Sequence, residues 1–205
     1  MTYSYFYNKN LIGDVLLISI DNELTTTSIK TFDDITLVYH DDILTGINIF
    51  NFSSVVKIKN EGRIVLPPNE MIDAINSKLS LISEIKLPYV TETGFKVGKI
   101  LTVDEHPESS HLHILTVDIG SEVLDIVCGA YNVKENMLVV VATIGTVMMD
   151  GTVIKPGKLL GEVSNGMCCS PKELGLKMDY PLHHLLVLDE DKVTIGQDFF
   201  SLKQI

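Results

Sequence analysis

Four apolar runs of strand length follow one another closely between residues 96 and 145, and they limit what this part of the chain can form. The runs are KVGKILTVDEH (96–106), HLHILTVDIG (111–120), VLDIVCGA (123–130) and MLVVVATIG (137–145). Each run alternates or stays apolar over the length of a strand, and turns rich in Gly, Asn, Asp or Pro separate them. About five such strands in about 100 residues predict a small closed barrel or sandwich.

The first part of the chain has a different pattern. Short runs rich in β-branched and aromatic residues predict strands at 3–7, 14–20, 35–40 and 46–52. After LPPN (66–69) comes an apolar series at steps of three and four residues, which predicts an amphipathic helix that is capped by Asn69 and ends near Leu87. The members of the series are Met71, Ile72, Ile75, Leu79, Ile82 and Ile85. The polar stretch PYVTETG (88–94) then predicts a boundary between an α+β domain of unknown role (1–90) and an all-β domain with short helices (91–205).

Charge and targeting signals restrict the possible partners. The net charge is −11, and both halves of the chain are acidic, so a general affinity for nucleic acid is excluded and RNA would need specific local contacts. No apolar run approaches the roughly 20 residues of a membrane helix, and the first residues do not resemble a signal peptide. Three cysteines suit free thiols in a reducing compartment. We therefore expect a cytoplasmic protein without a membrane partner.

The residues that usually carry chemistry form no catalytic arrangement. Cys168 and Cys169 are adjacent, so in a strand they point to opposite faces and cannot share a metal, while Cys128 is isolated in the sequence. His111 and His113 would share a strand face, which gives a metal-dependent hydrolase some support, but a surface pair is the simpler interpretation. Phosphate-binding glycine loops and nucleophile elbows are absent from the sequence. We therefore predict a protein that is not an enzyme and has no cofactor or metal.

The stretch SPKEL (170–174) has the pattern of a capped helix start. Ser170 and Glu173 have the spacing of a capping box around Pro171, and Gly175 would end the turn. The surrounding segment is then either a structural corner or a rim that presents Ser164, Asn165 and Lys172 to a ligand. The sequence leaves both interpretations open.

Several of these segments occur in an order that resembles a known family. The segments are HPESSHLHILTVDIG (106–120), IVCGAYNV (126–133), GKLLGEVSNGMCCSPKELGL (157–176) and GQDF (196–199). They resemble the tRNA-binding domain of the bacterial phenylalanyl-tRNA synthetase β chain and of the EMAP-II-like family. Because about 90 further residues precede this domain, the whole chain is most similar to stand-alone bacterial proteins of the YtpR type.

The resemblance implies an OB-fold barrel that holds tRNA without altering it, and it supplies candidate RNA-binding residues. These are Lys96, Lys99, His111, Asn132, Lys155, Lys158, Ser164, Asn165, Gly166, Met167 and Lys172. Two cations of the family pattern are missing, because Ser110-His111 replaces an Asp-[Lys/Arg] pair and Leu160 replaces an arginine. Each lost phosphate contact lowers both the affinity and its salt dependence.

We therefore expect weak, salt-sensitive tRNA binding, aided at mildly acidic pH where His111 lies at the interface. The alternative is a protein–protein adaptor or synthetase-associated module whose barrel has lost most of its RNA affinity. The resemblance also implies a homodimer, and the first domain is a candidate for binding a protein partner.

Overall fold

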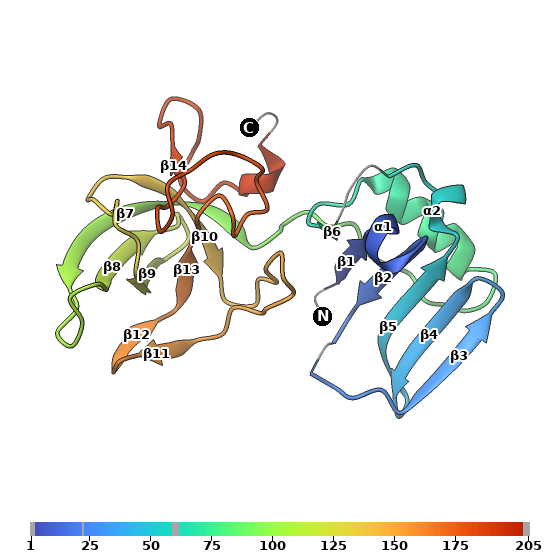
Figure 1. The fold of residues 1–205 in the computed structure, drawn as a ribbon. Coiled ribbons are helices and arrows are strands. Elements are labelled where there is room, and N and C mark those ends of the chain that lie inside the picture. Colours follow the sequence, from blue (N-terminus) through green and yellow to red (C-terminus); the bar gives the residue numbers. More distant parts are fainter. Residues whose placement is uncertain (1–2, 22, 59–61, 203–205) are drawn as a thin grey trace. The chain divides into compact units, whose positions relative to one another are not determined.

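The fold was obtained as a computed structural model, which describes residues 3–21, 23–58 and 62–202 (Figure 1). The chain divides into two compact units, Met1–Thr91 and Glu92–Ile205. Strands predominate in both, so the prediction of a mostly β chain is confirmed. The described residues contain no helix long and apolar enough to cross a membrane.

The first unit is built on a six-stranded antiparallel sheet in the order β3-β4-β5-β2-β1-β6 (Figure 1). Its strands are β1 (Ser4–Tyr7), β2 (Val15–Ser19), β3 (Ser28–Phe32), β4 (Ile35–His40), β5 (Ile43–Phe50) and β6 (Gly62–Ile64). Its helices are α1 (Lys9–Ile12), α2 (Asn69–Leu79) and the 3-10 turn η1 (Phe52–Ser54). Alternate residues of the central strands point to one face, where they form a core with the apolar stripe of α2.

Helix α2 is shorter than predicted. It ends at Leu79 instead of near Leu87, and no side chain caps its start, so the expected cap by Asn69 is wrong. The chain folds back after the helix because the Asn76 side chain donates to the carbonyl of Leu87 at 2.9 Å and accepts from its N–H at 2.7 Å. Ile82 and Ile85 continue the apolar series, but they pack on the same core from this returning segment.

The second unit is a five-stranded antiparallel sheet in the order β13-β10-β7-β8-β9, with β14 also paired to β10 and with a separate hairpin, β11–β12. Its strands are β7 (Phe95–Glu105), β8 (His113–Asp118), β9 (Val123–Cys128), β10 (Leu138–Thr143), β11 (Gly157–Leu159), β12 (Glu162–Ser164), β13 (Gly166–Cys168) and β14 (Val187–Leu188). The 3-10 turn η2 (Phe199–Ser201) follows. The four strands predicted from the closely spaced runs are therefore present.

The two edge strands of this sheet, β9 and β13, are not joined by a ladder among the described residues, so the predicted closed barrel is not completed by strand pairing. Single hydrogen bonds instead join β9 to the junction between β12 and β13. The N–H of Asn165 donates to the Asp125 carbonyl at 2.8 Å, and the N–H of Val127 donates to the Ser164 hydroxyl at 3.2 Å. The sheet encloses an apolar core that includes Cys128 and Cys168.

Candidate nucleic-acid interface

The loop that connects β7 to β8 is fastened to the hairpin β11–β12 through a buried histidine. His106 is 4% exposed, and its Nδ1 accepts the N–H of Glu108 at 3.1 Å. Because Nδ1 is an acceptor here, Nε2 carries the proton and donates to the carbonyl of Leu159 at 3.2 Å. This histidine, which the family pattern includes, therefore holds the loop between β7 and β8 against the hairpin β11–β12.

The tip of the hairpin is a two-residue turn that carries one of the sequence departures. Leu159 pairs with Glu162, so Leu160 and Gly161 form the turn, with φ of 46° and 89°. Positive φ at both positions matches a type I′ turn, where Asn or Gly is usual and leucine is strained. Leu160 is 49% exposed, so the position where the family has arginine projects an apolar side chain into solvent.

The residues that follow the hairpin connect strands. The Ser164 hydroxyl accepts from Val127 and donates to the Gly166 carbonyl at 3.3 Å. A Cβ on Gly166 would lie 3.2 Å from both the Ala142 carbonyl oxygen and Ile126 Cδ1, so a side chain is tightly restricted there. Ser164 and Gly166 thus support the interpretation as a structural corner, whereas the half-buried side chain of Asn165 makes no hydrogen bond among the described residues.

The corner at 170–176 is a single closed turn. The Glu173 carboxylate accepts from the Ser170 N–H at 2.6 Å and from its hydroxyl at 2.7 Å, and the Glu173 N–H donates to the Ser170 hydroxyl at 3.4 Å. Gly175 has φ of 71° and Leu176 donates to the carbonyl of Pro171 at 2.9 Å, which is the pattern of a Schellman motif. The predicted capping box is therefore confirmed, although the segment is one turn and is not among the helices.

The predicted cations differ in their availability. Lys96 forms a salt bridge with Glu92 at 3.1 Å, and its side chain is only 19% exposed. Lys99 is half-buried on β7, whereas Lys155, Lys158 and Lys172 are exposed. The structure thus places Lys158 on the hairpin and Lys172 on the closed corner, while Lys96 is neutralised by its partner.

The remaining predicted residues lie in three places. His111 is exposed in the loop before β8, so it does not share a strand face with His113 and that expectation is wrong. Asn132 holds the loop before β14, because its side chain donates to the Leu185 carbonyl at 3.1 Å and accepts from its N–H at 2.8 Å. Met167 is half-buried on β13 and lines a pocket.

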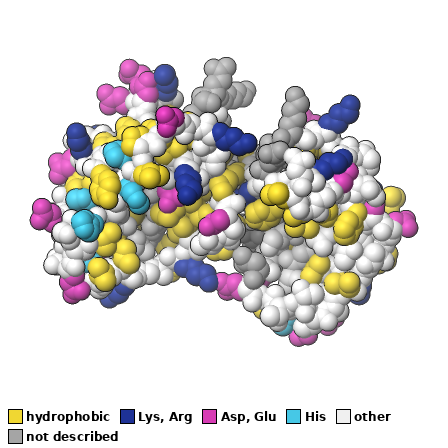
Figure 2. Space-filling view, viewed as in Figure 1, with side chains coloured by type: hydrophobic (Ala, Val, Ile, Leu, Met, Phe, Trp, Pro, Cys, Tyr) yellow, Lys and Arg dark blue, Asp and Glu magenta, His cyan; other side chains and the backbone are white. Residues whose placement is uncertain are grey.

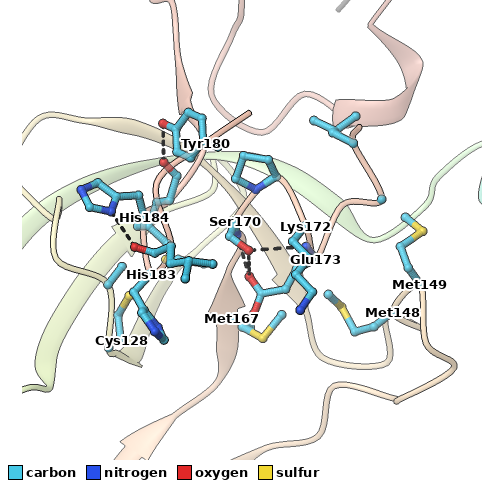
Figure 3. Close-up of a pocket in the computed structure, with 18 of the residues that line it drawn as sticks. Cys128, Met148, Met149, Met167, Ser170, Lys172, Glu173, Tyr180, His183 and His184 are labelled. Carbon is cyan, nitrogen blue, oxygen red and sulfur yellow. Dashed lines mark hydrogen bonds between the residues drawn. The ribbon is translucent and has the colours of Figure 1, made fainter. Parts of the chain in front are cut away.

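This pocket has a volume of about 1060 Å³ and lies beside the corner (Figure 3). Figure 3 shows His183 and His184 on one side, Met148 and Met149 on the other, and Lys172 between them. Its lining comes from the end of β9, the loop after β10, strand β13 and the segment from 170 to 185.

The three cysteines are buried and free. Cys128 is isolated in the sequence, but the fold places its thiol against that of Cys168, and together with burial this contact raises the pKa of Cys168. Cys169 is fully buried but is not part of the cluster that holds Cys128 and Cys168, and burial raises its pKa as well. The described residues hold no group of three or more His, Cys, Asp or Glu that could bind a metal. The hydrogen bond with Cys168 lowers the pKa of Cys128 in turn. The raised pKa values of Cys168 and Cys169 make these two thiols protonated packing groups in this structure.

Sequence reasoning did not identify two aromatic residues at the edge of the pocket. Tyr131 is 65% exposed, and its ring centroid lies 5.5 Å from that of His183. The motif IVCGAYNV contains Tyr131, and His183 stands in an adjacent histidine pair. Their separation of 52 positions left no local signal that they meet.

Comparison with known proteins places the second unit in a described family. A family model described as "Putative tRNA binding domain" matches residues 95–197, which is the second unit almost in full. The "Putative tRNA-binding protein YtpR" of Bacillus subtilis is 36% identical over 196 residues, which cover 91% of this chain and 94% of that protein.

Two synthetase subunits match over shorter stretches. The "Phenylalanine--tRNA ligase beta subunit" of Clostridium acetobutylicum is 42% identical over 130 residues, and the subunit of the same name from Sulfurimonas denitrificans is 45% identical over 105 residues. The matched stretches cover 63% and 51% of this chain but only 16% and 13% of those subunits. The match to the ligase subunits is thus confined to a small part of their length, whereas the B. subtilis protein matches almost end to end. The chain belongs to the family of proteins that carry this tRNA-binding domain, of which the B. subtilis protein is a relative over nearly its whole length.

Proposed function

We propose that this chain is a non-catalytic tRNA-binding protein whose second unit acts as an OB-type barrel. The observation that carries the proposal is the near end-to-end similarity to a protein named for tRNA binding, at 36% identity. The antiparallel order β13-β10-β7-β8-β9 and the bonds between β9 and the β12–β13 junction support a barrel of this type. Residues 1–90 form a separate domain in this proposal, and 91–205 form the binding domain.

The contacts that we assign to tRNA lie mainly on the hairpin and the residues that flank it, on the corner and in the loop before β8, with one further candidate on β7. Lys158 and Lys172 are exposed cations that supply phosphate contacts, with Lys155 and Lys99 as further candidates. His111 and Asn165 add polar contacts, whereas Ser164, Gly166 and Asn132 hold the backbone that presents them. Lys96 contributes little, because Glu92 already neutralises it.

We infer that the binding is weak and salt-sensitive. The chain carries a net charge of −11, and Leu160 and the Ser110-His111 pair leave two cations of the family pattern missing. The phosphate term in the affinity depends on the number of neutralised phosphates, so few exposed lysines give a small favourable contribution, and this contribution decreases as the salt concentration rises.

A tRNA titration at several salt concentrations tests the function, with filter binding or electrophoretic mobility as readout. The Lys158→Ala/Lys172→Ala double variant should bind more weakly, and the slope of log K against log[salt] should fall by roughly 1.4 to 1.8, which corresponds to two phosphate contacts. Lys192→Ala is the matched control, because Lys192 is exposed and already paired with Asp189 at 3.1 Å. Absence of wild-type binding at low salt and high micromolar protein contradicts the proposal.

The second candidate is a protein–protein adaptor, and the acidic charge with the missing cations favours it. An adaptor would co-purify with a protein and show no nucleic acid in the ratio of absorbance at 260 to 280 nm. Light scattering on the same sample measures whether the chain is the homodimer that the resemblance implies, and co-purification with residues 1–90 present or removed tests a protein partner for the first domain.

A further inference from the structure

A cluster of three rings, of which Tyr131 and His183 are exposed and His184 is half-buried, lies at one edge of the pocket. Tyr131 is 65% exposed, and its ring lies 5.5 Å from that of His183 and 6.3 Å from that of His184, centroid to centroid. Leu182 beside them is 78% exposed. Figure 2 shows hydrophobic and histidine side chains gathered together on this unit, at the left of the view. Exposed apolar side chains that gather in this way mark interaction sites more often than scattered ones do.

The backbone that carries these rings is firmly held. The Tyr131 N–H donates to the His183 carbonyl at 2.9 Å, which joins the two loops directly. The paired bonds between Asn132 and Leu185 hold the same loops one residue further along. His183 has φ of 58°, in the left-handed region that a histidine occupies uncommonly.

The charge beside the rings is balanced, in contrast with the rest of the chain. The charged lining residues of the pocket are two lysines, Lys172 and Lys177, and two acids, Asp150 and Glu173. The carboxylate of Glu173 is already bonded to Ser170 in the capping box. On a chain of net charge −11, this surface therefore opposes a polyanion less than the average surface does.

We propose that Tyr131 and His183 form a stacking surface for an unpaired base of the bound RNA. The proposal rests on the proposed function, because it specifies which part of the RNA meets this unit. Aromatic side chains stack on any base through its π-face, and methionine sulfur also makes favourable contacts with aromatic rings. Met167 and Lys172 line the pocket next to the rings. A base stacked on the rings and the phosphates next to that base therefore contact adjacent parts of one surface. This continuity favours RNA over an apolar protein segment.

The test compares Tyr131→Ala with Tyr131→Phe in the full chain by tRNA titration at several salt concentrations. Loss of one stacked base lowers the affinity about 5- to 150-fold, and Tyr131→Phe keeps the ring and stays within about twofold of the wild type. The salt slope stays unchanged in both variants, because no phosphate contact is removed. If the wild type binds tRNA and Tyr131→Ala binds equally well, the stacking proposal is overturned while the proposed function stands. If the wild type does not bind tRNA, both are overturned.

Photocrosslinking gives a readout that does not depend on a variant keeping its fold. With tRNA that contains 4-thiouridine, irradiation of the wild-type complex should attach RNA to peptides that contain Tyr131 or His183, as identified by mass spectrometry. Crosslinks confined to other peptides overturn the proposal. Loss of self-association in Tyr131→Ala with unchanged tRNA affinity would assign the rings to a protein contact, and it would overturn the proposal as well.

Discussion

The clamp between Asn132 and the loop before β14 gives the sharpest stability prediction. In Asn132→Ala, the N–H of Leu185 loses the acceptor that lies 2.8 Å away, and Leu185 is only 2% exposed. A buried donor left without a partner costs about 1–3 kcal/mol. The Leu185 carbonyl also loses the Asn132 amide, but it keeps the Tyr180 hydroxyl at 2.8 Å. We therefore expect Asn132→Ala to lower the free energy of unfolding of the second unit by about 2 kcal/mol.

The shared carbonyl allows a double-mutant cycle. In Tyr180→Phe the Leu185 carbonyl keeps the Asn132 amide at 3.1 Å, so the loss is one net hydrogen bond, about 0.5–1.5 kcal/mol. In the double variant the carbonyl loses both donors, so the loss exceeds the sum of the single losses by about 1 kcal/mol.

Hydrogen exchange in urea is the assay, and it is read from a peptide that covers β10. This peptide reports unfolding of the second unit whatever the first unit does, because β10 is fully within the second unit's sheet. A loss below about 0.5 kcal/mol in Asn132→Ala, or strict additivity in the cycle, would refute the clamp and leave Asn132 available as an RNA contact.

Three further predictions concern other parts of the chain. Leu160→Arg restores a cation at the hairpin tip, so the salt slope of tRNA binding should increase by about 0.7 to 0.9. The control variant Leu160→Gln should leave the slope unchanged. An unchanged slope in the arginine variant would place the hairpin tip away from the RNA. Hydrogen bonds from Ser53, together with those from the Tyr7 hydroxyl and Lys9, hold the pKa of Asp14 well below its usual range. The carboxylate therefore stabilises the first unit above about pH 4, and this contribution is lost as pH falls through the native pKa. Asp14→Asn should lower the melting temperature more at neutral pH than at about pH 3. An equal decrease at both pH values would contradict the stabilising role of the Asp14 carboxylate. Gly98→Ala would place a Cβ 2.8 Å from Val141 Cγ2, so it should destabilise the second unit by about 1–3 kcal/mol, whereas Gly157→Ala meets no atom within 4 Å and should be neutral.

The sequence predicted those elements whose apolar pattern matches their burial. Strands β8 and β9 largely alternate buried and less buried positions, and β10 and the first half of β7 are mostly buried, so their apolar patterns located them. Strand β3 was missed because all five of its residues are exposed at the sheet edge, which leaves no alternation. The helix α2 was predicted too long because the apolar period continues into a segment that folds back, and the bonds from Asn76 that turn it leave no local signal.

In the candidate site, too, the sequence predicted the local features but not the long-range ones. The capping box at Ser170 and Glu173 joins residues three positions apart, and the sequence predicted it correctly. The clamp by Asn132 and the contact of Tyr131 with His183 join residues more than 50 positions apart, so the sequence could not distinguish a loop-holding amide from an RNA-contacting one. Motif resemblance located Asn132 as a candidate, but only the long-range pairing of the chain shows that it holds the loop before β14 and that Tyr131 meets His183.

The balance of charge and stacking leads to a distinct expectation for this chain. Leu160 stands where the family pattern has arginine, so the electrostatic part of tRNA binding is reduced on a chain of net charge −11. Stacking on Tyr131 and His183 does not require a positive surface, and it is insensitive to counterion release. The chain should therefore retain a larger fraction of its tRNA affinity between 50 and 200 mM salt than a relative that has both cations. Parallel titrations of this protein and of a relative that carries both cations measure that fraction, and a steeper loss for this chain would show that its remaining lysines, and not its rings, dominate binding.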